Sequence, residues 1–153
     1  MVIRTKIIGY FFMLVLCVSL FAACKKDEVS SMLSVNATLS GANEVPAVTT
    51  TGTGTLTGTY DKETKLMTCI VNWKVDGTIL TGMHFHGPAS TTESAGVVIG
   101  FSGFSTSPSG TFTTTTRALT AAEEADLLAG KWYINVHSDK ARGGEIRGQL
   151  SVK

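Results

Sequence analysis

The chain contains 153 residues with a formal net charge of +1, and 43% of its residues are hydrophobic. A balance this close to neutral, without a basic stripe, argues against nucleic acid as a partner. The length is sufficient for one hydrophobic core but not for two, which excludes a two-domain organisation.

The chain opens with positive residues followed by an apolar run. Arg4 and Lys6 precede residues 7–21, a stretch typical of a signal peptide and too short to cross a bilayer comfortably. Ala22 and Ala23 then stand directly before Cys24, an arrangement that resembles a bacterial lipobox. The resemblance implies cleavage before Cys24 and acyl chains such as palmitate on that residue. An ordinary signal peptide with a chance cysteine, or an uncleaved anchor, are the alternatives.

We therefore expect a signal peptide over residues 1–23 and a lipidated tether over residues 24–31. An anchor with two or three acyl chains would attach the protein stably to a membrane, which places it in a bacterial cell envelope, at the outer membrane. The sequence Lys-Lys-Asp-Glu after Cys24 resembles an export signal of surface lipoproteins of the Bacteroidetes type. It is equally typical of a solvated tether, so both the periplasmic and the surface face stay open.

Short stretches with strand-like patterns follow one another along the rest of the chain. The stretch rich in threonine and glycine is predicted as a strand, with a low-complexity linker as the alternative, and residues 96–101 are predicted as a buried strand. Cys69 shares the apolar face of its strand and is predicted to be a buried structural thiol. The predicted strands cover residues 33–40, 49–60, 66–75, 78–86, 96–101, 111–117, 132–137 and 145–152.

One segment is predicted to be helical. Thr120 and Glu123 have the spacing of a capping box, Leu119 can pack on the first turn, and Gly130 is a natural C-cap. Seven to nine short strands with one short helix indicate an all-β fold, an antiparallel Greek-key β-sandwich. A parallel α/β fold is excluded because no crossover helices are present between the strands.

All three histidines of the chain lie in two of these strands. His84 and His86 are two residues apart, so a strand directs both imidazoles to one face, and His137 ends the strand over residues 132–137. Three neutral imidazoles are a suitable ligand set for zinc or copper and leave an open coordination position. Glu145 and Arg147 share a face of the last strand, where Glu145 could orient a ligand or become a fourth one.

Other interpretations of the same residues stay open. Histidines at strand ends also form hydrogen bonds with loop carbonyls, and Glu145 with Arg147 could pair with each other on a solvated face. A site for some other ligand is the third interpretation. The sequence has no nucleophile elbow, no glycine-rich loop before a helix and no carboxylate pair that would mark a hydrolase.

Four motifs in this order resemble the CHRD domain, a family named after the animal protein chordin. The motifs are Leu-Ser-Gly-Ala-Asn-Glu-Val-Pro at 39–46, His-Phe-His-Gly-Pro-Ala at 84–89, Trp-Tyr-Ile-Asn-Val-His at 132–137 and Gly-Glu-Ile-Arg-Gly-Gln-Leu at 144–150. The resemblance implies one CHRD domain over residues 32–153 and defines the fold more closely than the activity. The chordin partners, bone morphogenetic proteins, are not expected for a bacterial lipoprotein.

The histidine strand and the late Gly-Gly and arginine also resemble copper/zinc superoxide dismutase in architecture. That enzyme needs about six histidines and an intrachain disulfide, whereas this chain has three histidines, so dismutase activity is not expected. The sequence favours a non-enzymatic, lipid-anchored module that binds an extracytoplasmic metal ion, protein or glycan. The alternatives are a metalloenzyme or copper-handling protein of dismutase-like architecture, and a structural surface protein without a small ligand.

Overall fold

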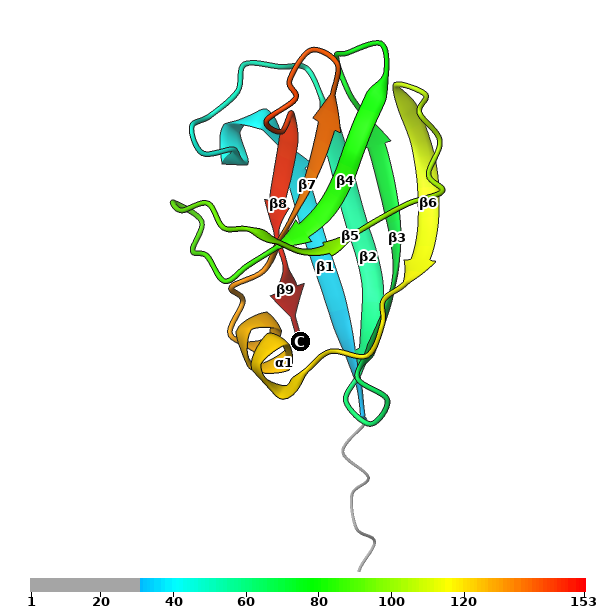
Figure 1. The fold of residues 1–153 in the computed structure, drawn as a ribbon, viewed down its shortest axis with the longest axis vertical. Helices are drawn as coiled ribbons and strands as arrows, with labels where there is room; N and C mark the ends of the chain where they lie inside the picture. Colours follow the sequence, from blue (N-terminus) through cyan, green and yellow to red (C-terminus); the bar gives the residue numbers. More distant parts are fainter. Residues whose placement is uncertain (1–30) are drawn as a thin grey trace, which may run out of the picture.

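A computed structural model describes residues 31–153 (Figure 1). The predicted signal peptide and the predicted lipidation site Cys24 lie outside these residues. The described residues form nine strands, one α-helix and a short 3-10 helix, so the predicted all-β fold class is confirmed. The strands are β1 (Met32–Ser40), β2 (Thr53–Asp61), β3 (Leu66–Lys74), β4 (Leu80–His86), β5 (Val97–Gly100), β6 (Ser109–Thr115), β7 (Tyr133–Ser138), β8 (Ile146–Gln149) and β9 (Ser151–Val152), and the helices are η1 (Gly41–Asn43) and α1 (Ala121–Leu128).

The strands form one continuous antiparallel sheet that curls until its two halves face each other. Its order is β5-β4-β7-β8-β1-β2-β3-β6, and β9 pairs with β1 outside this path. In Figure 1, β4, β7 and β8 lie in front of β1, β2 and β3. The neighbours β3 and β6, and likewise β4 and β7, are separated along the chain by other strands, so the connections cross between the halves in Greek-key fashion.

The core fills the space between the two halves. Alternation along β3 directs Met67, Cys69, Val71 and Trp73 inward, and β4 and β7 supply Phe85, Ile134 and other apolar residues from the opposite side. Cys69 is fully buried, as predicted, and burial raises the pKa of its thiol to about 12. A thiol in this environment stays protonated and packs as a small apolar group.

The helix begins with the predicted capping box. The Thr120 hydroxyl accepts a hydrogen bond from the Glu123 amide, while the Glu123 carboxylate accepts one from the Thr120 amide. The helix packs on the sheet through Leu127, which is fully buried, and Gly130 follows it in the left-handed region at φ +69°. Among residues 31–153, no helix is both long enough and apolar enough to pass through a membrane.

The structure corrects two predictions about single strands. Residues 96–101 were expected to form a buried strand, but β5 is an edge strand and Val97 is 55% exposed. The predicted strand over residues 145–152 divides at Leu150 into β8, which pairs with β7 and, through one bridge, β1, and β9, which pairs with β1. The threonine-rich stretch forms β2 between β1 and β3, in agreement with the strand prediction rather than a linker.

Candidate metal centre

Antiparallel pairing of β4 with β7 brings the three histidines to one face of the sheet. Gly82 lies opposite His137, His84 lies opposite Asn135, and His86 lies opposite Tyr133. Directly opposite residues of an antiparallel pair project to the same side, so these six residues form two adjacent columns. Met83 and Phe85, which flank His84 on β4, project into the core and are fully buried.

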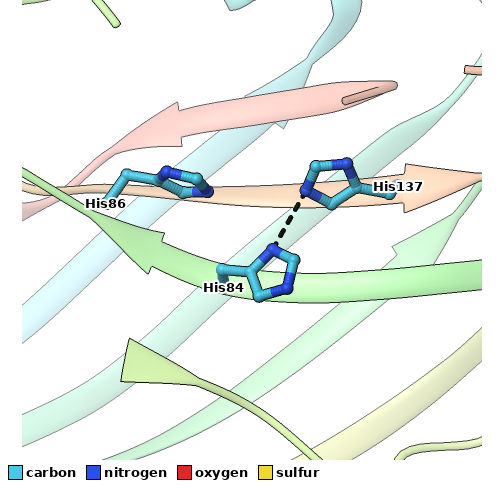
Figure 2. A group of neighbouring side chains, drawn as sticks. All are labelled: His84, His86 and His137. Atoms are coloured by element: carbon cyan, nitrogen blue, oxygen red, sulfur yellow. Dashed lines mark hydrogen bonds between the residues drawn. The ribbon is translucent and has the colours of Figure 1, made fainter. Parts of the chain in front are cut away.

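The three imidazoles are close enough to share one ion. One nitrogen from each of His84, His86 and His137 lies within 4.8 Å of the other two. The Nδ1 atom of His84 is 3.1 Å from Nε2 of His137, and Figure 2 shows these two nitrogens pointing at each other from β4 and β7. A tetrahedral zinc ion with bonds of about 2.0–2.1 Å requires ligand nitrogens separated by about 3.3 Å. The nitrogens of His84 and His137, 3.1 Å apart, nearly meet this requirement, and a nitrogen of His86 lies within 4.8 Å of both.

Backbone carbonyls fix the orientation of two of the rings. The Nδ1 atom of His86 lies 3.0 Å from the carbonyl oxygen of Ala95, and Nδ1 of His137 lies 2.8 Å from that of Arg142. A carbonyl oxygen only accepts hydrogen bonds, so Nδ1 carries the proton in both rings and Nε2 keeps its lone pair. This is the arrangement in which metal-ligating histidines are usually held. The prediction that strand-end histidines bond loop carbonyls is thus correct, and it is compatible with metal binding.

The Nε2 atom of His86 is buried and has no hydrogen-bond partner within residues 31–153. A buried nitrogen lone pair without a partner is costly, and it indicates a group that the protein chain does not supply. Gly82 and Gly100 flank His84, and neither has a side chain to cover its ring. The three histidines themselves are only partly buried.

The local environment favours neutral imidazoles. Burial lowers the pKa of His84, His86 and His137, and the neighbouring histidines lower those of His84 and His86 further, against the opposing effect of the carbonyl hydrogen bonds. Neutral imidazole is the form that binds metal ions. The cluster is therefore ready to bind a cation at neutral pH without first releasing protons from imidazolium groups.

A stack of three side chains supports the cluster on the β8 side. The rings of His86 and Tyr133 are parallel within 4°, with centroids 4.8 Å apart, and the Arg147 guanidinium carbon lies 3.5 Å from the Tyr133 centroid. All three side chains reach the loop between β4 and β5, residues 87–96. Arg147 donates to the carbonyls of Ser90 and Glu93, and Tyr133 exchanges hydrogen bonds with Ala95. Arg147, at 1% exposure, is therefore a buried clamp on this loop.

Glu145 lies in a different environment from the one considered in the sequence analysis. Its carboxylate accepts hydrogen bonds from Thr50, Ser138 and the Asp76 amide, and it is 1% exposed. Burial alone would raise its pKa, but these donors outweigh that effect and the pKa is lowered. Glu145 thus joins the loops that precede β2 and β4. Within residues 31–153, Glu145 forms no hydrogen bond with a histidine or with Arg147. The interpretation of a solvated Glu145–Arg147 pair is therefore corrected to two separate buried groups.

Two further buried polar residues beside the cluster were not singled out from the sequence as site residues. Asn135 lies between Tyr133 and His137 on β7, and its Nδ2 donates to Glu44 Oε1 at 2.8 Å. Glu44 is 9% exposed; burial raises its pKa to about 7, although Arg147 and Asn135 act in the opposite direction. Gly144, at φ +130°, packs so closely on both side chains that a Cβ there would collide with them.

A model of the CHRD domain matches residues 35–150, a span that contains all four motifs described above. No curated protein and no solved structure matches the chain. The match covers every residue of the histidine cluster together with Glu44, Asn135 and Arg147.

Proposed function

This chain belongs to the CHRD domain family, and we propose that it is a β-sheet binding module that holds one zinc or copper ion through His84, His86 and His137. The observation that carries the proposal is the convergence of three imidazole nitrogens within 4.8 Å, one of which, Nε2 of His86, is buried without a partner. The ring orientation supports it, because Nδ1 of two histidines is bound to carbonyls and Nε2 is left for the ion.

Three nitrogen ligands leave at least one coordination position for water or another small ligand. A site of this kind can store or deliver an ion, or present it to a further molecule, without acid–base chemistry from the protein. We therefore propose a binding role rather than catalysis. The alternative, a metalloenzyme or copper-handling protein of dismutase-like architecture, would use the same three histidines, and nothing among residues 31–153 favours it over a binding module.

Metal analysis tests this function directly. We expect full-length protein purified without a histidine tag to contain, or to take up, one equivalent of zinc or copper. His84→Ala and His137→Ala each remove one of three ligands and are expected to weaken metal affinity at least a hundredfold, which is measured by competition with a chromophoric chelator. Thr57→Ala, an exposed change in β2 on the opposite half of the sheet, is the control and keeps one equivalent. Wild-type protein without stoichiometric metal contradicts the proposal.

The proposal also includes the cellular location of the module. We infer from the lipobox-like sequence before Cys24 that the protein is attached to the outer membrane of a bacterial envelope by acyl chains, with the CHRD domain outside the cytoplasm. In the native host, metabolic labelling with palmitate is expected to mark the wild-type protein and not Cys24→Ser. The variant is expected to accumulate at the mass of the uncleaved precursor. Equal labelling of Cys69→Ser and wild type is the control, and equal labelling of Cys24→Ser overturns the inference.

A further inference from the structure

A second orphaned polar atom lies beside the histidine cluster. Within residues 31–153, three buried side-chain nitrogen or oxygen atoms have no hydrogen-bond partner, and two of them are His86 Nε2 and Asn135 Oδ1. These two residues are diagonal neighbours on β4 and β7, since Asn135 is opposite His84. Asn135 is 4% exposed, so bulk water does not satisfy its carbonyl oxygen. Both atoms belong to residues on the face of the sheet that carries the three histidines.

The orientation of the Asn135 amide is fixed from the other side. Its Nδ2 donates to Glu44 Oε1, and Gly144 packs against the same edge of the amide. Glu44 directly follows η1, and Gly144 lies in the loop between β7 and β8. The other end of the amide, Oδ1, has no hydrogen-bond partner within residues 31–153. His84 lies opposite Asn135 on β4, and His137 is two residues further along β7 on the same face of the sheet.

Resting on the proposed metal site, we propose that Asn135 is a positioning residue that selects the ligand at the open coordination position. Its Oδ1 can only accept a hydrogen bond, so it stabilises a metal-bound group that carries a proton, such as water or hydroxide. An anion without a proton, such as azide or a halide, would direct its own lone pairs at Oδ1. The site therefore binds protic ligands and discriminates against bare anions.

Azide titration of the copper(II)-loaded protein, followed by the azide-to-copper charge-transfer band, tests this selectivity. Replacing Asn135 by valine removes the acceptor but keeps much of the volume and suits a strand. We expect azide to bind about fivefold more tightly to Asn135→Val than to wild type, because the variant no longer stabilises the competing water by a hydrogen bond. Asn135→Ala is expected to give the same direction of change.

Thr57→Ala, the exposed change in β2 on the opposite half of the sheet, provides the control because it leaves Asn135 and its partners unchanged. Its azide affinity is expected to match that of wild type. One equivalent of copper with unchanged azide affinity in both Asn135 variants overturns this inference and leaves the proposed function intact, whereas absence of copper and zinc uptake refutes the proposed function itself. If neither variant folds, proton ENDOR of the wild-type copper form decides: exchangeable protons of a bound water support the proposal, and their absence overturns it.

Discussion

Replacement of Arg147 by alanine is expected to lower the free energy of unfolding by about 3–5 kcal/mol, measured by urea denaturation of the metal-free protein. The guanidinium is almost completely buried and donates to two loop carbonyls, and hydrogen bonds from a charged donor contribute about 1.5–3 kcal/mol each. Its stack on Tyr133 adds a cation–π interaction. Loss of the side chain would also leave a void between β8 and the loop over residues 87–96.

Two other substitutions at this position separate charge from geometry. Arg147→Lys keeps the charge but not the planar fork, so it is expected to restore less than half of the lost stability. Arg147→Met keeps the aliphatic stem alone and is expected to resemble alanine. If Arg147→Ala lowers the free energy of unfolding by less than about 1 kcal/mol, water is an adequate partner for the loop carbonyls. That result would contradict the role of Arg147 in holding the loop over residues 87–96.

The same substitution connects stability to the metal site. Ser90 and Glu93, which Arg147 holds, precede Ala95 in the loop, and the Ala95 carbonyl fixes the ring of His86. Arg147→Ala is therefore expected to weaken metal affinity as well, by about tenfold, the lower end for groups that orient a ligand. A residue that only contributed packing would change the free energy of unfolding without changing metal affinity. Thr57→Ala, the control, is expected to change neither the free energy of unfolding nor metal affinity.

The regular parts of the fold were predictable because strand alternation is a local signal. Leu66 to Lys74 alternates between buried and exposed residues over its whole length, as the sequence pattern predicted, and the capping box of α1 is contained in four residues. The two incorrect strand predictions concern segments whose burial or extent depends on which strands they pair with. The apolar composition of Val97–Gly100 predicted burial, but β5 is the last strand of its half and leaves Val97 exposed. Likewise, no local pattern shows that Leu150 ends the pairing with β7.

In the candidate site, too, the features set by local spacing were predictable and those set by tertiary pairing were not. The spacing of His84 and His86 predicted a common face, and the position of His137 on a strand made its approach plausible, but the register Gly82–His137 is a tertiary property. The solvated Glu145–Arg147 pair, one of the interpretations that stayed open, was based on alternation, which places both residues on one face of the strand. Loop segments far away in the sequence cover both side chains instead. Glu44 and Asn135 lie in two motifs of the family resemblance, and that shared presence was the available signal for their pairing.

Glu44→Gln is expected to become more stable relative to wild type by about 3 kcal/mol as the pH rises from 4 to 8. The pKa of Glu44 is raised from 4.5 to about 7 in the folded protein, chiefly by burial. Below pH 4.5 the carboxyl is protonated in both the folded and the unfolded state, so the raised pKa has no cost there. Between pH 4.5 and 7 the unfolded chain releases this proton while the folded protein retains it, so wild-type stability falls through that interval.

Glutamine resembles the protonated carboxyl in shape and in its carbonyl acceptor for Asn135, but it cannot ionise. The difference in unfolding free energy between Glu44→Gln and wild type, from urea denaturation at several pH values, isolates the Glu44 contribution. The histidines have the opposite sign, because their lowered pKa values cost stability as the pH falls below their unfolded values, but they are common to both proteins and cancel. Glu63→Gln, an exposed change on the β2–β3 turn, controls for the substitution itself. A difference that stays constant from pH 4 to 8 would mean that Glu44 ionises in the folded protein as readily as in the unfolded chain, with Arg147 compensating its burial.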